Sequence, residues 1–188
     1  MENSININSY SISAFSASSD EMIAQALRTY NVKNQTPVIA CIGSDLVLGD
    51  SLGPLVGTFL TKKRLPFYIY GTLNSTITAK DVVCVKRQLK LFHPNSFTVA
   101  VDAAVGEGDD VGLIKAVGGS LKPGLGVNKK LGTIGDCSII GIVAEKSEKN
   151  YNLFNTTRLN LIYKMAETIA GGIEKFLSEP RSQTKLYA

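Results

Sequence analysis

Residues 37–54 read PVIACIGSDLVLGDSLGP, and this stretch decides the fold. It begins with an apolar run, rich in β-branched side chains and bounded by Pro37 and Gly43, which is typical of a strand buried on both faces. A short polar turn follows, and Pro54 then stands in the first turn of a helix, where its missing N–H group is no loss. A strand that leads through a loop into a helix is typical of an open α/β sheet, whose ligands bind outside the carboxyl ends of the strands.

Further strands and helices alternate along the chain. Apolar runs and helical spacing predict strands at residues 67–70, 97–101, 111–117 and 138–143, and helices at residues 20–27, 55–60, 78–92 and 157–177. The connection that leads into the strand at 111–117 is too short for a helical crossover, so this strand is expected to run antiparallel. The predicted fold class is α/β, a three-layer α/β/α sandwich around a mostly parallel five-stranded sheet with one antiparallel strand.

The predicted domain organisation is simple. Residues 1–19 are rich in serine and asparagine and nearly uncharged, which predicts a flexible N-terminal arm and leaves a removable pro-segment open. Residues 20–178 are enough to bury a core and are expected to form a single α/β/α domain. Residues 179–188 are expected to form a polar tail.

Composition and charge exclude several classes of protein. Hydrophobic residues make up 44% of the 188 residues and charged residues 19%, which is typical of a globular protein. The net charge of +4 includes no dense basic block, so we expect no nucleic acid partner. Cys41, Cys84 and Cys137 are dispersed and odd in number, which argues against a disulfide framework and a zinc cluster. Without an apolar run of membrane-spanning length, we expect no membrane partner and a cytoplasmic location.

Two acidic residues are the strongest candidates for catalysis. Asp50 and Asp102 follow parallel strands whose carboxyl ends are expected to meet at one edge of the sheet. Two neighbouring carboxyl groups cannot both ionise freely, so one keeps a proton and acts as an acid while the other activates water. Each residue also has a structural explanation, which stays open: Asp50 as a helix cap and Asp102 as the anchor of its own loop.

Other catalytic schemes lack a component. His93 is the single histidine, and it precedes the strand at 97–101, on the edge of the sheet opposite Asp102. A Ser-His-Asp or Cys-His site therefore has no base, and a histidine-ligated zinc site is disfavoured. We interpret His93 as a residue that ends a helix. No cofactor is expected, although a divalent metal that bridges Asp50 and Asp102 stays open.

Three segments are candidates for substrate contacts. Asp45 lies in the turn before Asp50, and Thr72 and Ser75 follow the strand at 67–70. The glycine-rich segment 118–130 is long for a loop inside a compact domain, and such loops are more often functional than idle. In it, Gly126, Asn128 and Lys129 are candidates to hold a substrate backbone or an acidic side chain. The alternatives are a mobile connection for this segment and a polar helix-entry loop for residues 71–76.

Three motifs carry a resemblance to a known group of proteins. CIGSD to DSLGP at residues 41–54, VAVDA at 99–103 and GLGVNKK at 124–130 resemble the spore germination protease and its relatives, among them the YyaC-type sporulation proteins of endospore-forming Firmicutes. The hydrogenase maturation endopeptidases share the wider fold. The resemblance implies a phosphorylase/hydrolase-like sheet, with Asp50 and Asp102 as the first and second acid of the protease pair. The maturation endopeptidases use a histidine beside a nickel-contacting Glu and Asp, and this chain has no histidine in the matching late segment.

The resemblance also implies a function. We expect a sporulation-associated peptidase without a metal, which hydrolyses peptide bonds with Asp50 and Asp102. Its protein or peptide substrate would be small acid-soluble spore proteins or another sporulation protein, in the cytoplasm of the forespore or the mother cell. The alternative is a non-catalytic peptide- or metal-binding sporulation protein on the same fold. A homo-oligomer is left open.

Overall fold

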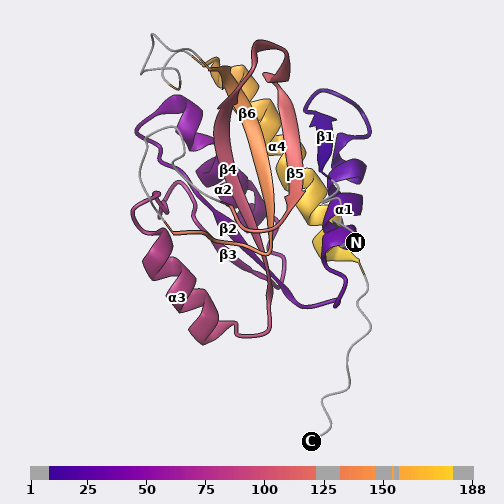
Figure 1. Cartoon of the computed structure of the whole chain (residues 1–188), viewed down its shortest axis with the longest axis vertical. Coiled ribbons are helices and arrows are strands. Elements are labelled where there is room, and N and C mark those ends of the chain that lie inside the picture. Colours follow the sequence, from indigo (N-terminus) through magenta and orange to yellow (C-terminus); the bar gives the residue numbers. More distant parts are fainter. Residues whose placement is uncertain (1–8, 122–131, 147–153, 155–156, 180–188) are drawn as a thin grey trace, which may run out of the picture.

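The computed structural model describes residues 9–121, 132–146, 154 and 157–179. In this part of the chain, six strands form one sheet with helices on both faces (Figure 1). The strands are β1 (Tyr10–Ser13), β2 (Pro37–Cys41), β3 (Tyr68–Tyr70), β4 (Phe97–Gly106), β5 (Leu113–Gly118) and β6 (Cys137–Glu145). The helices are α1 (Ser19–Tyr30), α2 (Leu52–Lys62), α3 (Val82–Phe92) and α4 (Leu159–Ser178), with the short 3-10 turns η1 (Leu48–Ser51) and η2 (Gly108–Asp110).

The sheet has the order β1-β5-β6-β4-β2-β3. Strands β3, β2, β4 and β6 are parallel to one another, whereas β5 runs antiparallel to both of its neighbours, β6 and β1. The predicted α/β fold, with a mostly parallel sheet and one antiparallel strand, is therefore confirmed. The short η2 connection between β4 and β5 leaves no room for a crossover helix, which explains the reversed direction of β5.

The sheet has one strand more than the sequence analysis expected. Strand β1 lies in the segment interpreted as a loose arm, and it pairs with β5 at the edge of the sheet. Ile12 of β1 is buried opposite Ile114, and the carbonyl oxygen of Ala14 accepts a 3.0 Å hydrogen bond from the Thr168 hydroxyl of α4. Residues 10–14 are thus held by the sheet and by α4, although their serine-rich composition does not predict a strand.

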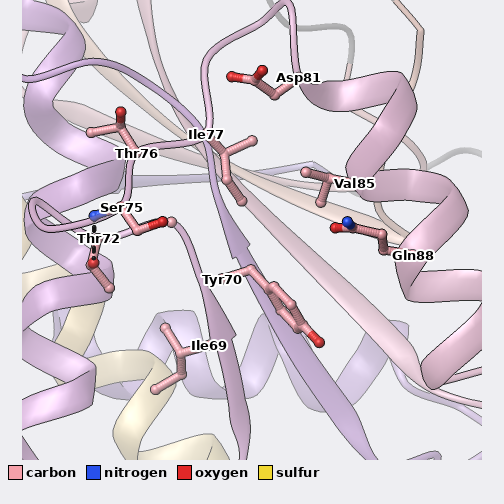
Figure 2. A pocket seen from close by; sticks show the side chains of 10 residues that line it. Ile69, Tyr70, Thr72, Ser75, Thr76, Ile77, Asp81, Val85 and Gln88 are labelled. Carbon is pink, nitrogen blue, oxygen red and sulfur yellow. Dashed lines mark hydrogen bonds between the residues drawn. The ribbon is translucent and has the colours of Figure 1, made fainter.

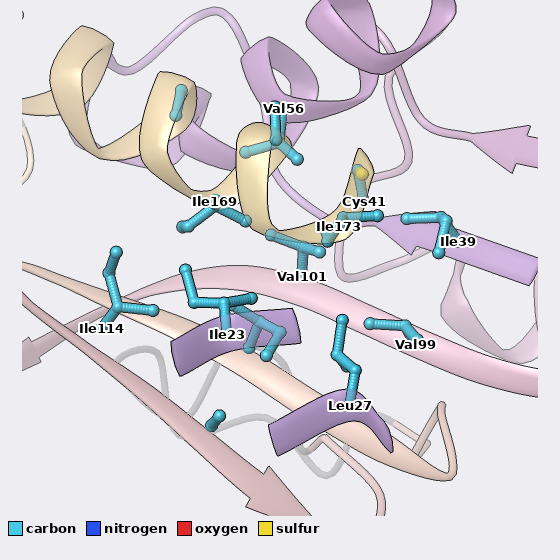
Figure 3. Close-up of a cluster of buried hydrophobic side chains, with 14 of the residues drawn as sticks. Ile23, Leu27, Ile39, Cys41, Val56, Val99, Val101, Ile114, Ile169 and Ile173 are labelled. Carbon is cyan, nitrogen blue, oxygen red and sulfur yellow. The ribbon is translucent and has the colours of Figure 1, made fainter. Parts of the chain in front are cut away.

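The two faces of the sheet are covered unequally. Helices α1, α2 and α4 pack on one face and α3 packs on the other (Figure 1). Alternate side chains of β4 serve the two layers, since Val99 and Val101 lie in the larger apolar cluster and Ala100 lies in the smaller one. Figure 3 shows part of the larger cluster, to which α1 contributes Ile23 and α4 contributes Ile169. Burial of this apolar surface is the main stabilising contribution to the fold.

Two glycines allow α2 to approach the sheet closely. A Cβ atom at Gly53 would overlap the carbonyl oxygen of Ile42, just after β2. A Cβ atom at Gly57, one turn further along α2, would overlap the carbonyl oxygen of Gly71, which follows β3. Helix α2 therefore starts directly against the carboxyl ends of β2 and β3. Among the described helices, none has both the length and the apolar content needed to cross a membrane.

Candidate active site

A tight turn after β2 places Asp50. Gly43 has a φ angle of +143°, which favours glycine, and a Cβ atom there would overlap the carbonyl oxygen of Asp50. The Ser44 N–H donates a 3.1 Å hydrogen bond to that same oxygen, which folds η1 back onto the end of β2. The N-cap of α2 is Ser51, and it makes no side-chain cap hydrogen bond. Asp50 therefore does not occupy the capping position that the structural alternative required.

Asp102 lies within β4, where the sequence analysis expected a strand that ends at Val101. Strand β4 continues because it stays paired with β6 after its pairing with β2 ends at Cys41. Asp102 is only 7% exposed, and its Oδ1 accepts a 2.9 Å hydrogen bond from the Ala103 N–H. No other hydrogen bond to this carboxyl group occurs within the part of the chain that the structure describes. A buried carboxyl group with so few donors is held more easily as the neutral acid.

The electrostatics of the two acids support this conclusion. Burial raises the pKa of Asp102 well above 3.8, against the opposing effect of the Ala103 N–H, and the negative charge of Asp50 raises it further. Burial also raises the pKa of Asp50, and the Ser44 backbone N–H opposes that shift. The structure thus brings Asp50 and Asp102 within electrostatic range of each other. The negative charge of Asp50 therefore adds to the effect of burial and disfavours ionisation of Asp102.

Thr72 and Ser75 line a cavity of about 310 Å³, to which neither Asp50 nor Asp102 contributes a lining side chain. Figure 2 shows side chains around the cavity, which come from the end of β3, from the segment that follows it, and from α3. The lining residues are Ile69, Tyr70, Gly71, Thr72, Ser75, Thr76, Ile77, Asp81, Val85 and Gln88. The carbonyl oxygen of Ile77 accepts a 2.8 Å hydrogen bond from the Gly43 N–H. The cavity wall is therefore bonded directly to the turn that carries Asp50.

Asp45 and His93 are not among the residues that line the cavity. Asp45 is exposed on the turn before Asp50. Gly126, Asn128 and Lys129 lie outside the described residues, so their predicted substrate contacts stay predictions. His93 follows α3, and its Nε2 atom lies 2.8 Å from the Tyr70 hydroxyl, in a hydrogen bond that fits the structural role expected for it. Within the described ranges, no three His, Cys, Asp or Glu side chains are grouped so that they could hold a metal ion.

Comparison with known proteins places the chain in a family. Residues 8–172 match the profile of the family described as "Protein of unknown function (DUF1256)". The chain belongs to the DUF1256 family. It is also similar to the "Uncharacterized protein YyaC" of Bacillus subtilis (strain 168), with 42% identity over 137 residues, which cover 72% of this chain and 67% of that protein. The resemblance to YyaC-type proteins is thereby confirmed, whereas relations to the germination protease and to the maturation endopeptidases stay predictions.

In this DUF1256 chain, sequence analysis missed the contribution of α3 and of its N-cap residue Asp81 to the cavity. Asp81, Val85 and Gln88 were assigned only to a helix, yet all three line the cavity. Their spacing, four and then three residues, places them on one helical face, and this face combines a charge, an apolar group and an amide. Asp81 and Gln88 are exposed and Val85 is buried, as on any amphipathic helix, so the sequence held no specific signal for this cavity.

The raised pKa of Asp102 predicts that Asp102→Asn stabilises this DUF1256 protein at neutral pH. Between pH 3.8 and the folded-state pKa, the unfolded chain loses the Asp102 proton while the folded chain keeps it. The wild-type free energy of unfolding therefore falls across this interval, by about 1.4 kcal/mol for each unit by which the pKa is raised. Asparagine still accepts the Ala103 hydrogen bond and has no such penalty.

Urea unfolding of both proteins, at neutral pH and near pH 3.8, measures this difference. We expect a clear gain for the variant at neutral pH and a much smaller one at the lower pH. An equal gain at both pH values would contradict a raised pKa of Asp102.

Proposed function

We propose that this chain is a peptidase in which Asp50 and Asp102 activate a water molecule to attack a peptide carbonyl. The observation that carries the proposal is Asp102, which is only 7% exposed and whose pKa is raised by burial and, further, by the negative charge of Asp50. Burial of an ionisable group with few hydrogen bonds is unfavourable for stability, and such groups cluster at functional sites.

The two acids have different roles in the proposed mechanism. Asp102 is the more buried and keeps the shared proton, whereas Asp50 is ionised. Asp50 takes a proton from the water molecule while the water oxygen attacks the carbonyl carbon. At the same time Asp102 donates its proton to the carbonyl oxygen. When the tetrahedral intermediate breaks down, that oxygen returns a proton to Asp102, and Asp50 passes its proton to the leaving nitrogen. Backbone N–H groups at the start of α2 are the proposed hydrogen-bond donors that orient the carbonyl oxygen before Asp102 protonates it.

The biological setting is part of the proposal. The motifs at residues 41–54, 99–103 and 124–130 resemble the germination protease, and the YyaC relative comes from Bacillus subtilis. We therefore place the activity in the forespore or mother cell of an endospore-forming bacterium. The proposed substrates are small acid-soluble spore proteins or another sporulation protein.

Cleavage of a defined peptide mixture tests the proposal. The purified chain is incubated with small acid-soluble spore proteins and with a synthetic peptide library, and the products are identified by mass spectrometry. We expect new pairs of fragments that share one cut position, with and without EDTA. Loss of cleavage in EDTA would indicate that a metal ion bridging the two acids, and not the acid pair alone, activates the water. No cleavage of any substrate, by the full chain or after removal of residues 1–8, would contradict a peptidase.

The pH dependence of cleavage is a separate prediction. The mechanism needs one proton on the acid pair, so kcat/KM is expected to follow a bell-shaped curve. The lower limb reports the pKa of the ionised acid and should lie above pH 3.8, because burial raises the pKa of Asp50. The upper limb reports the loss of the Asp102 proton and should lie well above pH 3.8. Initial rates across the pH range measure both limbs, and a flat profile would contradict the shared proton.

A non-catalytic peptide-binding protein is the second candidate function. The cavity of about 310 Å³ favours it, because a protein that only binds peptides needs the cavity and not the proton transfer. The two candidates differ in one measurement. A peptide that binds with unchanged mass after long incubation supports the binding protein, whereas a cut peptide supports the enzyme.

A further inference from the structure

The cavity between β3 and α3 has the size of a side-chain pocket. Its volume of about 310 Å³ is at the lower end of the range for ligand sites, which is suited to one residue of a peptide and not to a large ligand. Ile69 and Tyr70 of β3, the strand at one edge of the sheet, are part of its wall. Because Ile77 in its wall is hydrogen-bonded to Gly43, a peptide anchored here passes next to the turn of Asp50.

The lining of the cavity selects a type of side chain. Ile77, Val85 and the Tyr70 ring form apolar walls, as Figure 2 shows, and Gln88 adds an amide. Asp81 is the one charged residue among the lining residues that the structure describes, and no lysine, arginine or histidine is among them. An apolar wall with a single negative charge suits a long aliphatic chain that ends in a cation. An aromatic ring in the wall adds a favourable contact for a cation.

Local hydrogen bonds prepare Asp81 for this role. The Thr78 N–H and the Thr78 hydroxyl donate to Oδ2 of Asp81, at 2.9 Å and 2.6 Å. These bonds lower the pKa of Asp81, so its carboxylate is ionised at neutral pH. Within the described residues, the other oxygen, Oδ1, accepts no hydrogen bond. The carboxylate is thus held in one orientation, with one oxygen available to a ligand.

We propose that this cavity binds a lysine or arginine side chain of the peptide substrate. The aliphatic part packs against Ile77, Val85 and Tyr70, and the cationic end pairs with Oδ1 of Asp81. This inference rests on the proposed function for the identity of the ligand as a peptide. The cavity then selects substrates that carry a basic residue close to the peptide bond that is cut.

Binding of short peptides to an inactive protein tests the pocket independently of catalysis. The protein is the full chain with both Asp50→Asn and Asp102→Asn, and the probes are blocked alanine peptides with lysine, arginine, norleucine or glutamate at the centre. Amide NMR shifts of Gly71, Thr72 and Ser75 report binding at the cavity. We expect the lysine and arginine peptides to bind about fivefold more tightly than the norleucine peptide, the scale of an exposed ion pair.

Two further variants locate the interaction. Asp81→Asn should make lysine and norleucine peptides bind equally, whereas Asp109→Asn, an exposed aspartate on η2, should leave the preference unchanged. Ser75→Trp places a large ring at the cavity and should abolish binding of every peptide, while the Ser75 side chain makes no hydrogen bond within the described residues that this change would break. Equal binding of lysine and norleucine peptides to the protein with an intact Asp81 would overturn the proposal.

The failure of the pocket and the failure of the peptidase are distinguishable. If the protein binds basic peptides selectively but cleaves no substrate, the pocket is supported and the peptidase proposal is contradicted. Cleavage at positions without a nearby lysine or arginine supports the enzyme and overturns the pocket. Cleavage next to basic residues that becomes unselective in Asp81→Asn supports both.

Discussion

Asp50→Asn and Asp102→Asn are each expected to lower the rate of peptide cleavage by about three orders of magnitude, the scale of a lost general acid or base. Neither an amide nor a single remaining carboxyl group exchanges protons as the pair does. Asparagine keeps the size of aspartate, and at position 102 it also keeps the hydrogen bond from the Ala103 N–H. The fold should therefore survive in both variants while the chemistry is lost.

Initial rates on a cleaved peptide, with thermal unfolding measured in parallel, check this expectation. Asp109→Asn is the matched control, because Asp109 is an exposed aspartate on η2, in the connection between β4 and β5. It should cleave at the wild-type rate. If Asp50→Asn and Asp102→Asn also cleave at that rate, the acid pair is not the catalytic site. If they lose activity only because they unfold, the thermal transitions will show it.

Gly53→Ala has the largest expected effect on stability, a loss of about 3 kcal/mol in the free energy of unfolding. The new methyl group would overlap the carbonyl oxygen of Ile42, and backbone at the end of a buried strand has little freedom to move. Relief requires a shift of α2 away from β2. Because η1 leads directly into α2, the same shift moves Asp50, so cleavage should fall together with stability.

Gly171→Ala provides the matched control for this substitution. Gly171 lies inside α4, and the nearest atom to an added Cβ there is the Asp20 Cβ at 3.7 Å, an ordinary contact. Alanine favours the helix, so we expect a gain of about 0.5–1 kcal/mol. Urea unfolding of both variants measures the difference. Similar stabilities of the two variants would mean that α2 is not held against β2 by the close approach at Gly53.

Much of the fold could be predicted from local patterns. The five strands found by the sequence analysis are apolar runs bounded by turn residues, and each coincides with an observed strand. The direction of β5 followed from the length of one connection, because a chain that short has no alternative. Helix α3 was predicted from residue 78 onward, but it begins at Val82. Residues 78–81 form a turn before it, in which the Thr78 N–H donates a hydrogen bond to the Asp81 carboxylate.

The elements that were missed depend on distant partners. Strand β1 exists because β5 offers it an edge and because Ile12 fits the core between sheet and helices. Three of its four residues are polar or aromatic and are exposed or only partly buried. The segment by itself therefore does not indicate a strand. Strand β4 continues past Asp102 for the same reason, because β6 supplies its hydrogen bonds there. Pairing of this kind is decided by the partner strand and not by the propensity of the segment.

The sequence by itself determined the type of sheet, the turn after β2 and the presence of two aspartates near its carboxyl edge, because these follow from local spacing and chain direction. Tertiary structure alone decided the burial of Asp102, since its exposure depends on packing from segments far away in the chain. It also decided the cavity, whose walls come from residues 69–77 and 81–88. Neither segment forms the cavity alone. The cavity exists only because α3 packs on the sheet next to the end of β3.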